Sequence, residues 1–114
     1  MAEECLFCKM ASGEMDVSKL YDDAEVFAIR DINPRAPVHF MVIPKRHIPS
    51  VAEVGEAEGS LLGRIFSVAN QVAQQEGIAE SGYRFAFNYG RDGGQTIGHL
   101  HMHVLGGRRL GAEG

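Results

Sequence analysis

The sequence predicts an α+β fold built on one antiparallel sheet of about five strands. Two kinds of pattern support this prediction: several short segments alternate apolar and polar residues, as strands do, and one longer segment repeats its apolar residues with the period of a helix. In chain order we expect a short helix, three strands, a long helix and two more strands, an order that fits one sheet with helices packed on it. The 114 residues suit a single domain spanning residues 1–114 with its own core.

Four short elements are expected in the first half of the chain: a helix over residues 3–11 and strands over residues 19–21, 25–30 and 38–43. Gly13 breaks the helix. A tight turn at Asp22 and Asp23 joins the first two strands. Residues 31–37 form a loop, because their two prolines lack the backbone donors that a strand interior needs, and Pro44 ends the third strand.

The second half is expected to contain a long helix over residues 58–76 and strands over residues 83–88 and 99–105. The apolar residues of the helix form one stripe that packs against the sheet: Leu61, Leu62, Ile65, Val68, Ala69, Val72 and Ala73. Gly77 is placed to cap the C-terminus of this helix. Before the helix, Ser50 and Glu53 have the spacing of a capping box that opens a minor helical turn, which Gly55 ends.

The last strand carries three of the five histidines, His99, His101 and His103, at alternate positions. Since successive strand side chains point to opposite faces, the three imidazoles share one face, and the other face turns toward the core with Leu100, Met102 and Val104. Neighbours two apart on a strand are roughly 6.5–7 Å apart, so the row can span a phosphate and the groups beside it. Metal binding competes with catalysis here, because two such histidines can share one zinc ion.

Composition excludes several classes of partner. Apolar residues make up 45% of the chain and charged residues 23%, as in ordinary globular proteins. The net charge of −4, without a basic stripe, argues against a nucleic-acid surface. The first residues lack the order of a signal peptide, and no apolar run approaches the ~18–20 residues of a membrane span, so we expect a cytoplasmic protein without a membrane partner. Cys5 and Cys8 are too close for a disulfide framework and favour a thiol or metal motif.

The histidine row and the segments around it resemble the histidine triad (HIT) superfamily. The resemblance rests on His99 to Leu105 and on segments that contain Asp31 to Pro34, Ala36 to Phe40, Ile43 to Ile48, Gly82 to Arg84, Asn88, Asp92 to Gln95 and Leu105 to Arg108. It covers the chain from Leu6 to about Arg109 and is closest to the histidine triad nucleotide-binding proteins, which are purine nucleoside phosphoramidases. It implies a HIT-like fold with one long helix and one or two short helices.

The resemblance also implies roles for the histidines. His101 would be the nucleophile that attacks the α-phosphorus, expels the amine and leaves a nucleotidyl-imidazole for water to hydrolyse. A neutral imidazole, with an ordinary pKa near 6.5, suits this attack at pH 7. His103 would act as an acid or phosphate partner, and His47 and His99 would orient the site or relay protons. His39 is expected to be a structural histidine.

The nucleotide would be held by residues carried over from the same family. Asp31 would bind the ribose hydroxyls and Asn88 the sugar or phosphate. Backbone donors of the loop that includes Gly94 and Gln95, with the Thr96 hydroxyl, would bind phosphoryl oxygens. The base would lie among apolar side chains: Leu6, Phe7, Phe27, Ile29 and Ile32.

The pair Cys5 and Cys8 resembles that of a zinc-bearing variant within the superfamily. Together with His47 and His99 it would complete a tetrahedral site of two sulfur and two nitrogen ligands. This zinc would be structural, since the phosphoramidase mechanism requires no metal. The expected partners are a purine nucleotide substrate and a second copy of the chain, because members of this branch are homodimers.

Two other functions compete with phosphoramidate hydrolysis. One is dinucleoside polyphosphate hydrolysis, another activity of the superfamily. The other is a non-catalytic module that binds nucleotide or zinc and serves in protein interactions. Faster cleavage of a dinucleoside polyphosphate than of a phosphoramidate would indicate the polyphosphate hydrolase. Nucleotide binding without turnover of either substrate would indicate the non-catalytic module.

Overall fold

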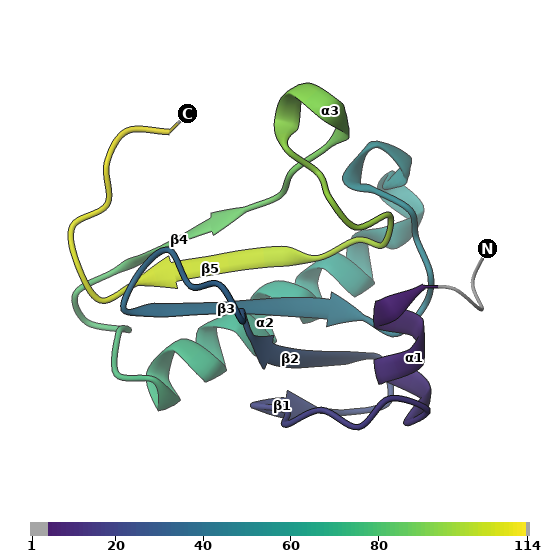
Figure 1. Ribbon diagram of the computed structural model, residues 1–114, viewed down its shortest axis with the longest axis horizontal. Coiled ribbons are helices and arrows are strands. Elements are labelled where there is room, and N and C mark those ends of the chain that lie inside the picture. Colours follow the sequence, from purple (N-terminus) through teal and green to yellow (C-terminus); the bar gives the residue numbers. More distant parts are fainter. Residues whose placement is uncertain (1–4, 114) are drawn as a thin grey trace.

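The computed structural model describes residues 5–113 and confirms one five-stranded antiparallel sheet. The strand order is β1-β2-β3-β5-β4, with β1 and β4 at the two edges (Figure 1). The strands are β1 (Tyr21–Asp22), β2 (Val26–Arg30), β3 (Val38–Pro44), β4 (Tyr83–Ala86) and β5 (Met102–Gly106). The strand that contains His103, β5, therefore lies inside the sheet, where its pairing with β3 and β4 fixes the position of each side chain.

The long helix α2 (Gly59–Gln75) lies behind the sheet in Figure 1 and covers one of its faces. Its predicted stripe packs with alternate residues of the strands in one core: Val26, Ala28, Phe40, Val42, Ile65, Val68, Ala69, Val72, Ala73, Met102 and Val104. The helix ends as predicted at Gly77, which has a φ of 79°. The Gly77 N–H donates to the Gln74 carbonyl and the Ile78 N–H to the Ala73 carbonyl, the two bonds of a Schellman cap.

The short helix α1 (Leu6–Ser12) packs on the opposite face, in front of the sheet in Figure 1. A second core lies beneath it, made of Phe7, Met10, Phe27, Ile29, Met41 and Ile43. Gly13 ends α1 with a φ of 85°, as predicted. The expected start of this helix, residues 3 and 4, lies outside the described residues. The sheet thus has a core on each face, and the smaller core, beneath α1, borders the histidine row.

Several expected details differ from the structure. Ser50 caps the 3-10 turn η2 (Val51–Glu53) by accepting from the Ala52 N–H rather than through a reciprocal pair with Glu53. The reciprocal bond occurs one turn later, where Glu58 Oε1 accepts from the Gly55 N–H at 2.7 Å in η3 (Glu56–Glu58). Gly55 therefore opens a turn instead of ending one.

The elements near the histidines are shorter than expected. β5 begins at Met102, so His99 and His101 precede the strand. β4 ends at Ala86, and a four-residue helix, α3 (Gly90–Gly93), lies in the segment expected to be loop. Backbone pairing explains these ends, since the β4 register stops at Ala86 opposite His103. Within residues 5–113, no helix combines the length and apolar character that a membrane crossing requires.

Candidate active site

The histidine row lies on the face of the sheet that bears α1. In the register of β5, His103 is opposite Met41 of β3 and Ala86 of β4. The intervening side chains, Leu100, Met102 and Val104, enter the α2 core as the alternation predicts. The imidazoles of His101 and His103 are adjacent, with ring centroids 5.0 Å apart. The row therefore forms even though only its last member belongs to the strand itself.

His101 has one nitrogen fixed and the other free. Its Nδ1–H donates to the backbone carbonyl of His99 at 2.7 Å, so a neutral ring has its lone pair on Nε2. The edge of the buried Phe7 ring packs against the imidazole, with centroids 5.2 Å apart. The ring lines a hollow of about 420 Å³ with Asp31, Asn33, Arg35, Asn88, Gly93, Gly94, Thr96 and His103, which we call the histidine hollow. The expected nucleophile thus reaches an open space.

A chain of hydrogen bonds orients His103. The backbone N–H of Arg35 donates to His39 Nδ1 at 3.1 Å, so a neutral His39 holds its proton on Nε2. That Nε2–H donates to His103 Nδ1 at 2.9 Å, which leaves the proton of a neutral His103 on its Nε2. Burial lowers the pKa of His103 to about 4, with neighbouring His101 and His39 acting in the same direction, so this ring is neutral at pH 7. His103 therefore presents an N–H donor.

Asp31 closes this network at the rim of the hollow. One of its carboxylate oxygens lies 3.4 Å from His39 Nε2 and 3.9 Å from His103 Nδ1. The other oxygen accepts from the Asn33 N–H, the turn bond that an aspartate before Asn-Pro commonly makes. Asp31 thus lines the histidine hollow and also stabilises the turn that follows β2.

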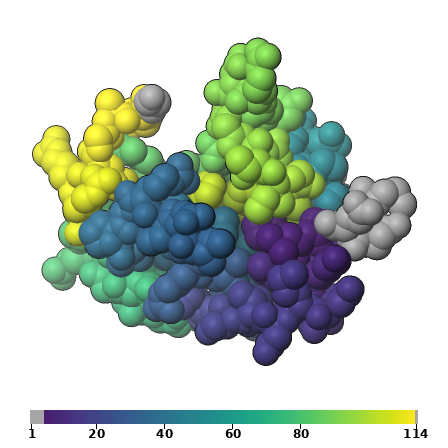
Figure 2. Space-filling model, viewed as in Figure 1, coloured from purple at the N-terminus to yellow at the C-terminus, as the bar shows by residue number. Residues whose placement is uncertain are grey.

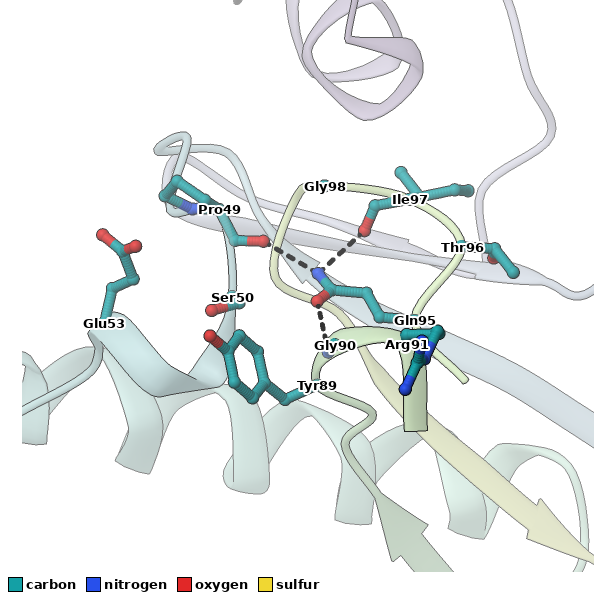
Figure 3. A pocket seen from close by; sticks show the side chains of 10 residues that line it. All are labelled: Pro49, Ser50, Glu53, Tyr89, Gly90, Arg91, Gln95, Thr96, Ile97 and Gly98. Carbon is teal, nitrogen blue, oxygen red and sulfur yellow. Dashed lines mark hydrogen bonds between the residues drawn. The ribbon is translucent and has the colours of Figure 1, made fainter. Parts of the chain in front are cut away.

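The glycine-rich loop also lines the histidine hollow. Asn88 Nδ2 donates to the Gly93 carbonyl at 2.7 Å, and Gly94 follows with a φ of 79°, a conformation that favours glycine. Gly94 and Thr96 line the histidine hollow as the resemblance implied. The Gln95 side chain instead serves the loop itself, since it donates to the carbonyls of Pro49 and Ile97 and accepts from the Gly90 N–H (Figure 3). Its backbone N–H also serves the loop, since it donates to the Gly90 carbonyl at 3.0 Å, and Gln95 is not among the residues that line the histidine hollow.

The five apolar residues expected to surround a base have unequal exposure. Phe27 is fully buried, and Phe7 and Ile29 are 1% and 5% exposed, all within the core beneath α1. Leu6 is 38% exposed and Ile32 is 91% exposed. The structure therefore leaves Leu6 and Ile32 with free apolar surface, whereas the other three support the site from below.

Cys5, Cys8, His47 and His99 converge at the N-terminus of α1. Their four ligand atoms all lie within 4.8 Å of one another. His99 Nε2–H donates to the Pro44 carbonyl at 2.8 Å, which leaves the His99 Nδ1 lone pair for the cluster. That atom is 3.1 Å from His47 Nδ1, 3.2 Å from Cys5 Sγ and 3.6 Å from Cys8 Sγ. Tetrahedral zinc with ordinary bond lengths has N···N edges of about 3.3 Å and N···S edges of about 3.5 Å, so the four groups fit this metal.

A second group of ligand-type residues, Asp31, His39 and His103, is also compact. It suits a metal less well, because the Arg35 N–H points at His39 Nδ1 and holds the His39 proton on Nε2, the atom that would have to bind the ion. The group is better described as a hydrogen-bonded relay.

His39 and Arg35 are parts of the site that the sequence did not reveal. His39 is placed beside His103 by the pairing of β3 with β5, a register that alternation within one strand does not define. The available signal was the alternation of β3, which puts His39 on the same face as Met41 and Ile43.

The fold and this site define a histidine triad protein: a family model described as "HIT domain" matches residues 12–110, and the chain belongs to that family. The resemblance seen in the sequence is therefore confirmed. A protein of Escherichia coli (strain K12) named purine nucleoside phosphoramidase is 49% identical over 111 residues, which cover 97% of this chain and 93% of that relative. An uncharacterized HIT-like protein of Synechococcus elongatus is 43% identical over 110 residues, which cover 96% of each chain.

Solved structures agree with the family assignment. A HIT family hydrolase from Clostridium thermocellum matches with a TM-score of 0.92 and 48% identity, covering 97% of this chain and 96% of that chain. A HIT family hydrolase from Legionella pneumophila Philadelphia 1 also has a TM-score of 0.92, with 44% identity, and covers 95% of this chain and 96% of that chain. The α+β sheet with one long helix is thus the fold of this family.

Proposed function

We propose that this chain is a hydrolase that cleaves the P–N bond of purine nucleoside 5′-phosphoramidates. The observation that carries the proposal is that His101 lines the histidine hollow while its Nδ1–H is bound to a backbone carbonyl, which leaves the Nε2 lone pair for attack. The name of the E. coli relative, at 49% identity over nearly the whole chain, supports the same substrate class.

The proposed reaction has two steps. His101 Nε2 attacks the α-phosphorus, a bond from phosphorus to that nitrogen forms, and the P–N bond to the amine breaks with its electron pair leaving on the amine. As this bond breaks, the leaving nitrogen accepts a hydrogen bond from His103 Nε2–H, the donor that the His39 bond sets in place. A water molecule gives one proton to the departing amine, and its hydroxide attacks phosphorus. The bond from phosphorus to His101 Nε2 then breaks with its electron pair returning to that nitrogen, which restores the protein to its starting state.

The proposed nucleotide contacts follow the histidine hollow. Asp31 accepts from the ribose hydroxyls, Asn88 holds the sugar or phosphate, and Gly94 and Thr96 line the place where phosphoryl oxygens bind. Gln95 supports this binding by bracing the loop through its side chain and its backbone N–H. The exposed side chains of Leu6 and Ile32 offer apolar surface for a purine, with Phe7, Phe27 and Ile29 beneath them. Adenosine monophosphate is the product we expect from an adenosine substrate.

We propose structural zinc at Cys5, Cys8, His47 and His99. The donor set of two thiolates and two imidazoles suits this ion. Bound zinc would tie α1 to the segment that precedes β5 and thereby fix Phe7 against His101. It would leave the chemistry to His101 and His103, which are not among the four ligands, and the ligand His99 would orient His101 through its backbone carbonyl.

A homodimer and a cytoplasmic location complete the proposal. The edge strand β4 lies next to α2, where the half-exposed Phe66 stacks on Phe85 with ring centroids 5.8 Å apart, and this apolar edge suits a second copy of the chain. Free Cys5 and Cys8 beside two histidines suit a reducing compartment.

A fluorogenic adenosine 5′-phosphoramidate, incubated with and without a chelator, tests the proposal. We expect turnover that survives metal removal for as long as the fold survives, because zinc takes no part in either step. Faster cleavage of a dinucleoside polyphosphate would instead support the polyphosphate hydrolase. Binding of adenosine monophosphate without turnover of either substrate would support the non-catalytic module.

A further inference from the structure

A second hollow adjoins the histidine hollow at His103. It has a volume of about 520 Å³ and shares Arg35, Asn88 and His103 with the first hollow. Ala86 and Leu105 give it apolar surface, and Glu113 near the C-terminus also lines it. We call it the tail hollow; Figure 2 shows it as the notch between the yellow tail and the green segment after β4.

Arg84 holds the C-terminal segment that contains Gly111 and Glu113 in place beside this hollow. Its Nη2 donates to the Gly111 carbonyl at 2.7 Å and lies 3.4 Å from a carboxylate oxygen of Glu113. The positive charge of Arg84 is therefore already paired with a carboxylate of the tail.

Arg35 differs from Arg84, because it makes no ion pair within residues 5–113. Its backbone is held on both sides of the Cα atom, since the N–H of Arg35 donates to His39 Nδ1 and its carbonyl accepts from the Arg108 guanidinium at 3.0 Å. Its side chain is exposed and lines both hollows. The guanidinium is close enough to lower the pKa of both His39 and His103, although burial is the larger cause in each case. A free cation thus stands where the two hollows meet.

The in-line geometry of phosphoryl transfer indicates which part of the substrate occupies the tail hollow. Phosphoryl transfer places the attacking and leaving atoms roughly in line on opposite sides of phosphorus. The attack comes from His101, and along β5 the direction away from His101 passes His103 and reaches Leu105. Leu105 lines the tail hollow, so the leaving group extends into it.

We propose that the tail hollow binds the leaving amine and that Arg35 selects amines bearing a carboxylate, as amino acids do. This inference rests on the proposed phosphoramidase function. A guanidinium forms strong charge-assisted hydrogen bonds with a carboxylate, often through two parallel N–H groups. Arg84, being paired with Glu113, maintains the wall of the hollow instead.

Two matched substrates test the inference: adenosine 5′-phosphoramidates whose amine is glycine, with a free carboxylate, or glycinamide, which is neutral and of similar size. We expect the native chain to favour the glycine substrate about tenfold in kcat/KM, from one partly exposed charge-assisted bond. In Arg35→Gln that ratio should fall to near one. The substitution keeps the backbone N–H that orients His39, so the relay remains. Assays at pH 8 keep His39 and His103 neutral in both proteins, since burial lowers the pKa of each.

Arg91→Gln is the matched control, because Arg91 is an exposed arginine that lines neither the histidine hollow nor the tail hollow. Its ratio should equal that of the native chain. A native ratio near one, or an equal loss on both substrates in Arg35→Gln, would overturn the inference, since equal loss means that the guanidinium binds the phosphoryl group. Unsubstituted adenosine 5′-phosphoramidate separates the two failures. If it is cleaved, only the inference fails, and if none of the three is cleaved, the proposed function fails with it.

Discussion

Each histidine of the row has one ring nitrogen committed to a fixed partner, and that partner decides what the other nitrogen can do. A backbone carbonyl holds the proton of His101 on Nδ1, and another holds the proton of His99 on Nε2. His103 receives its orientation from His39. As a result, neighbouring rings of the same chemistry can serve as nucleophile, metal ligand and proton donor.

Replacing His101 by glycine should remove the nucleophile without disturbing nucleotide binding. We expect kcat to fall by at least ~10³-fold, as with other residues that act directly on the reacting atom. Binding of adenosine monophosphate, measured by calorimetry, should stay within a few fold of the native value. Added imidazole should restore part of the turnover by occupying the vacated space. Native-like turnover in His101→Gly would contradict the assignment of the nucleophile.

The low pKa of His103 should make stability depend on pH. Between about pH 6.5 and pH 4 the unfolded chain binds a proton that folded His103 does not, so the free energy of unfolding falls as the pH falls through this window. Between pH 8 and pH 5 the native chain should lose roughly 2 kcal/mol more than His103→Gln. Urea unfolding at the two pH values measures both losses. Equal losses would show that His103 is not the group responsible.

At the scale of single elements, two glycines of the α2 region provide a matched pair of substitutions. Gly77 has a φ of 79° at the C-terminal cap, whereas Gly63 is exposed within the helix, and an added Cβ would have open space at either position. Gly77→Ala should destabilise by about 1 kcal/mol through backbone strain, and Gly63→Ala should stabilise by about 0.5–1 kcal/mol. Thermal unfolding of the two variants checks the opposite signs. The same sign in both would show that strain at the cap does not dominate.

The elements that the sequence predicted well are those governed by local pattern. Alternation around His101 identified its face, and the spacing of the α2 stripe identified that helix to within one residue at each end. Features that depend on distant pairing could not be read in the same way. The bond from His39 to His103 joins residues 64 positions apart, and the Gln95 side chain reaches the Pro49 carbonyl 46 positions away. The helix α3 lies between glycines whose local pattern favours a loop.

At the scale of the whole molecule, the site depends on a helix that has little core of its own. Helix α1 buries only Phe7 and Met10, and its N-terminus is Cys5 of the metal-type cluster. A structural ion there would connect it to His47 and His99, which belong to segments far away in the chain. The integrity of the α1 face should therefore depend on metal.

A double substitution, Cys5→Ser with Cys8→Ser, tests this dependence. We expect the purified variant to retain no zinc by mass spectrometry and to lose roughly 3–4 kcal/mol of stability relative to the zinc-saturated chain, the size of a linkage effect at 100–1,000 times Kd. Turnover should fall only in proportion to the fraction of the variant that is unfolded at the assay temperature, because zinc takes no part in either step of the reaction. Leu6→Ala, which leaves the cluster intact, serves as the comparison. Unchanged stability in the cysteine variant would show that the cluster carries no ion.

The two cores lie on opposite faces of the sheet, and this separation allows stability and activity to be engineered independently. The α2 side contains the larger apolar volume and none of the reacting groups, whereas the α1 side contains the chemistry and little of the packing. Thermostability and substrate range can accordingly be optimised in different libraries, one for each face, and combined afterwards. Distant, non-contacting changes of this kind generally add.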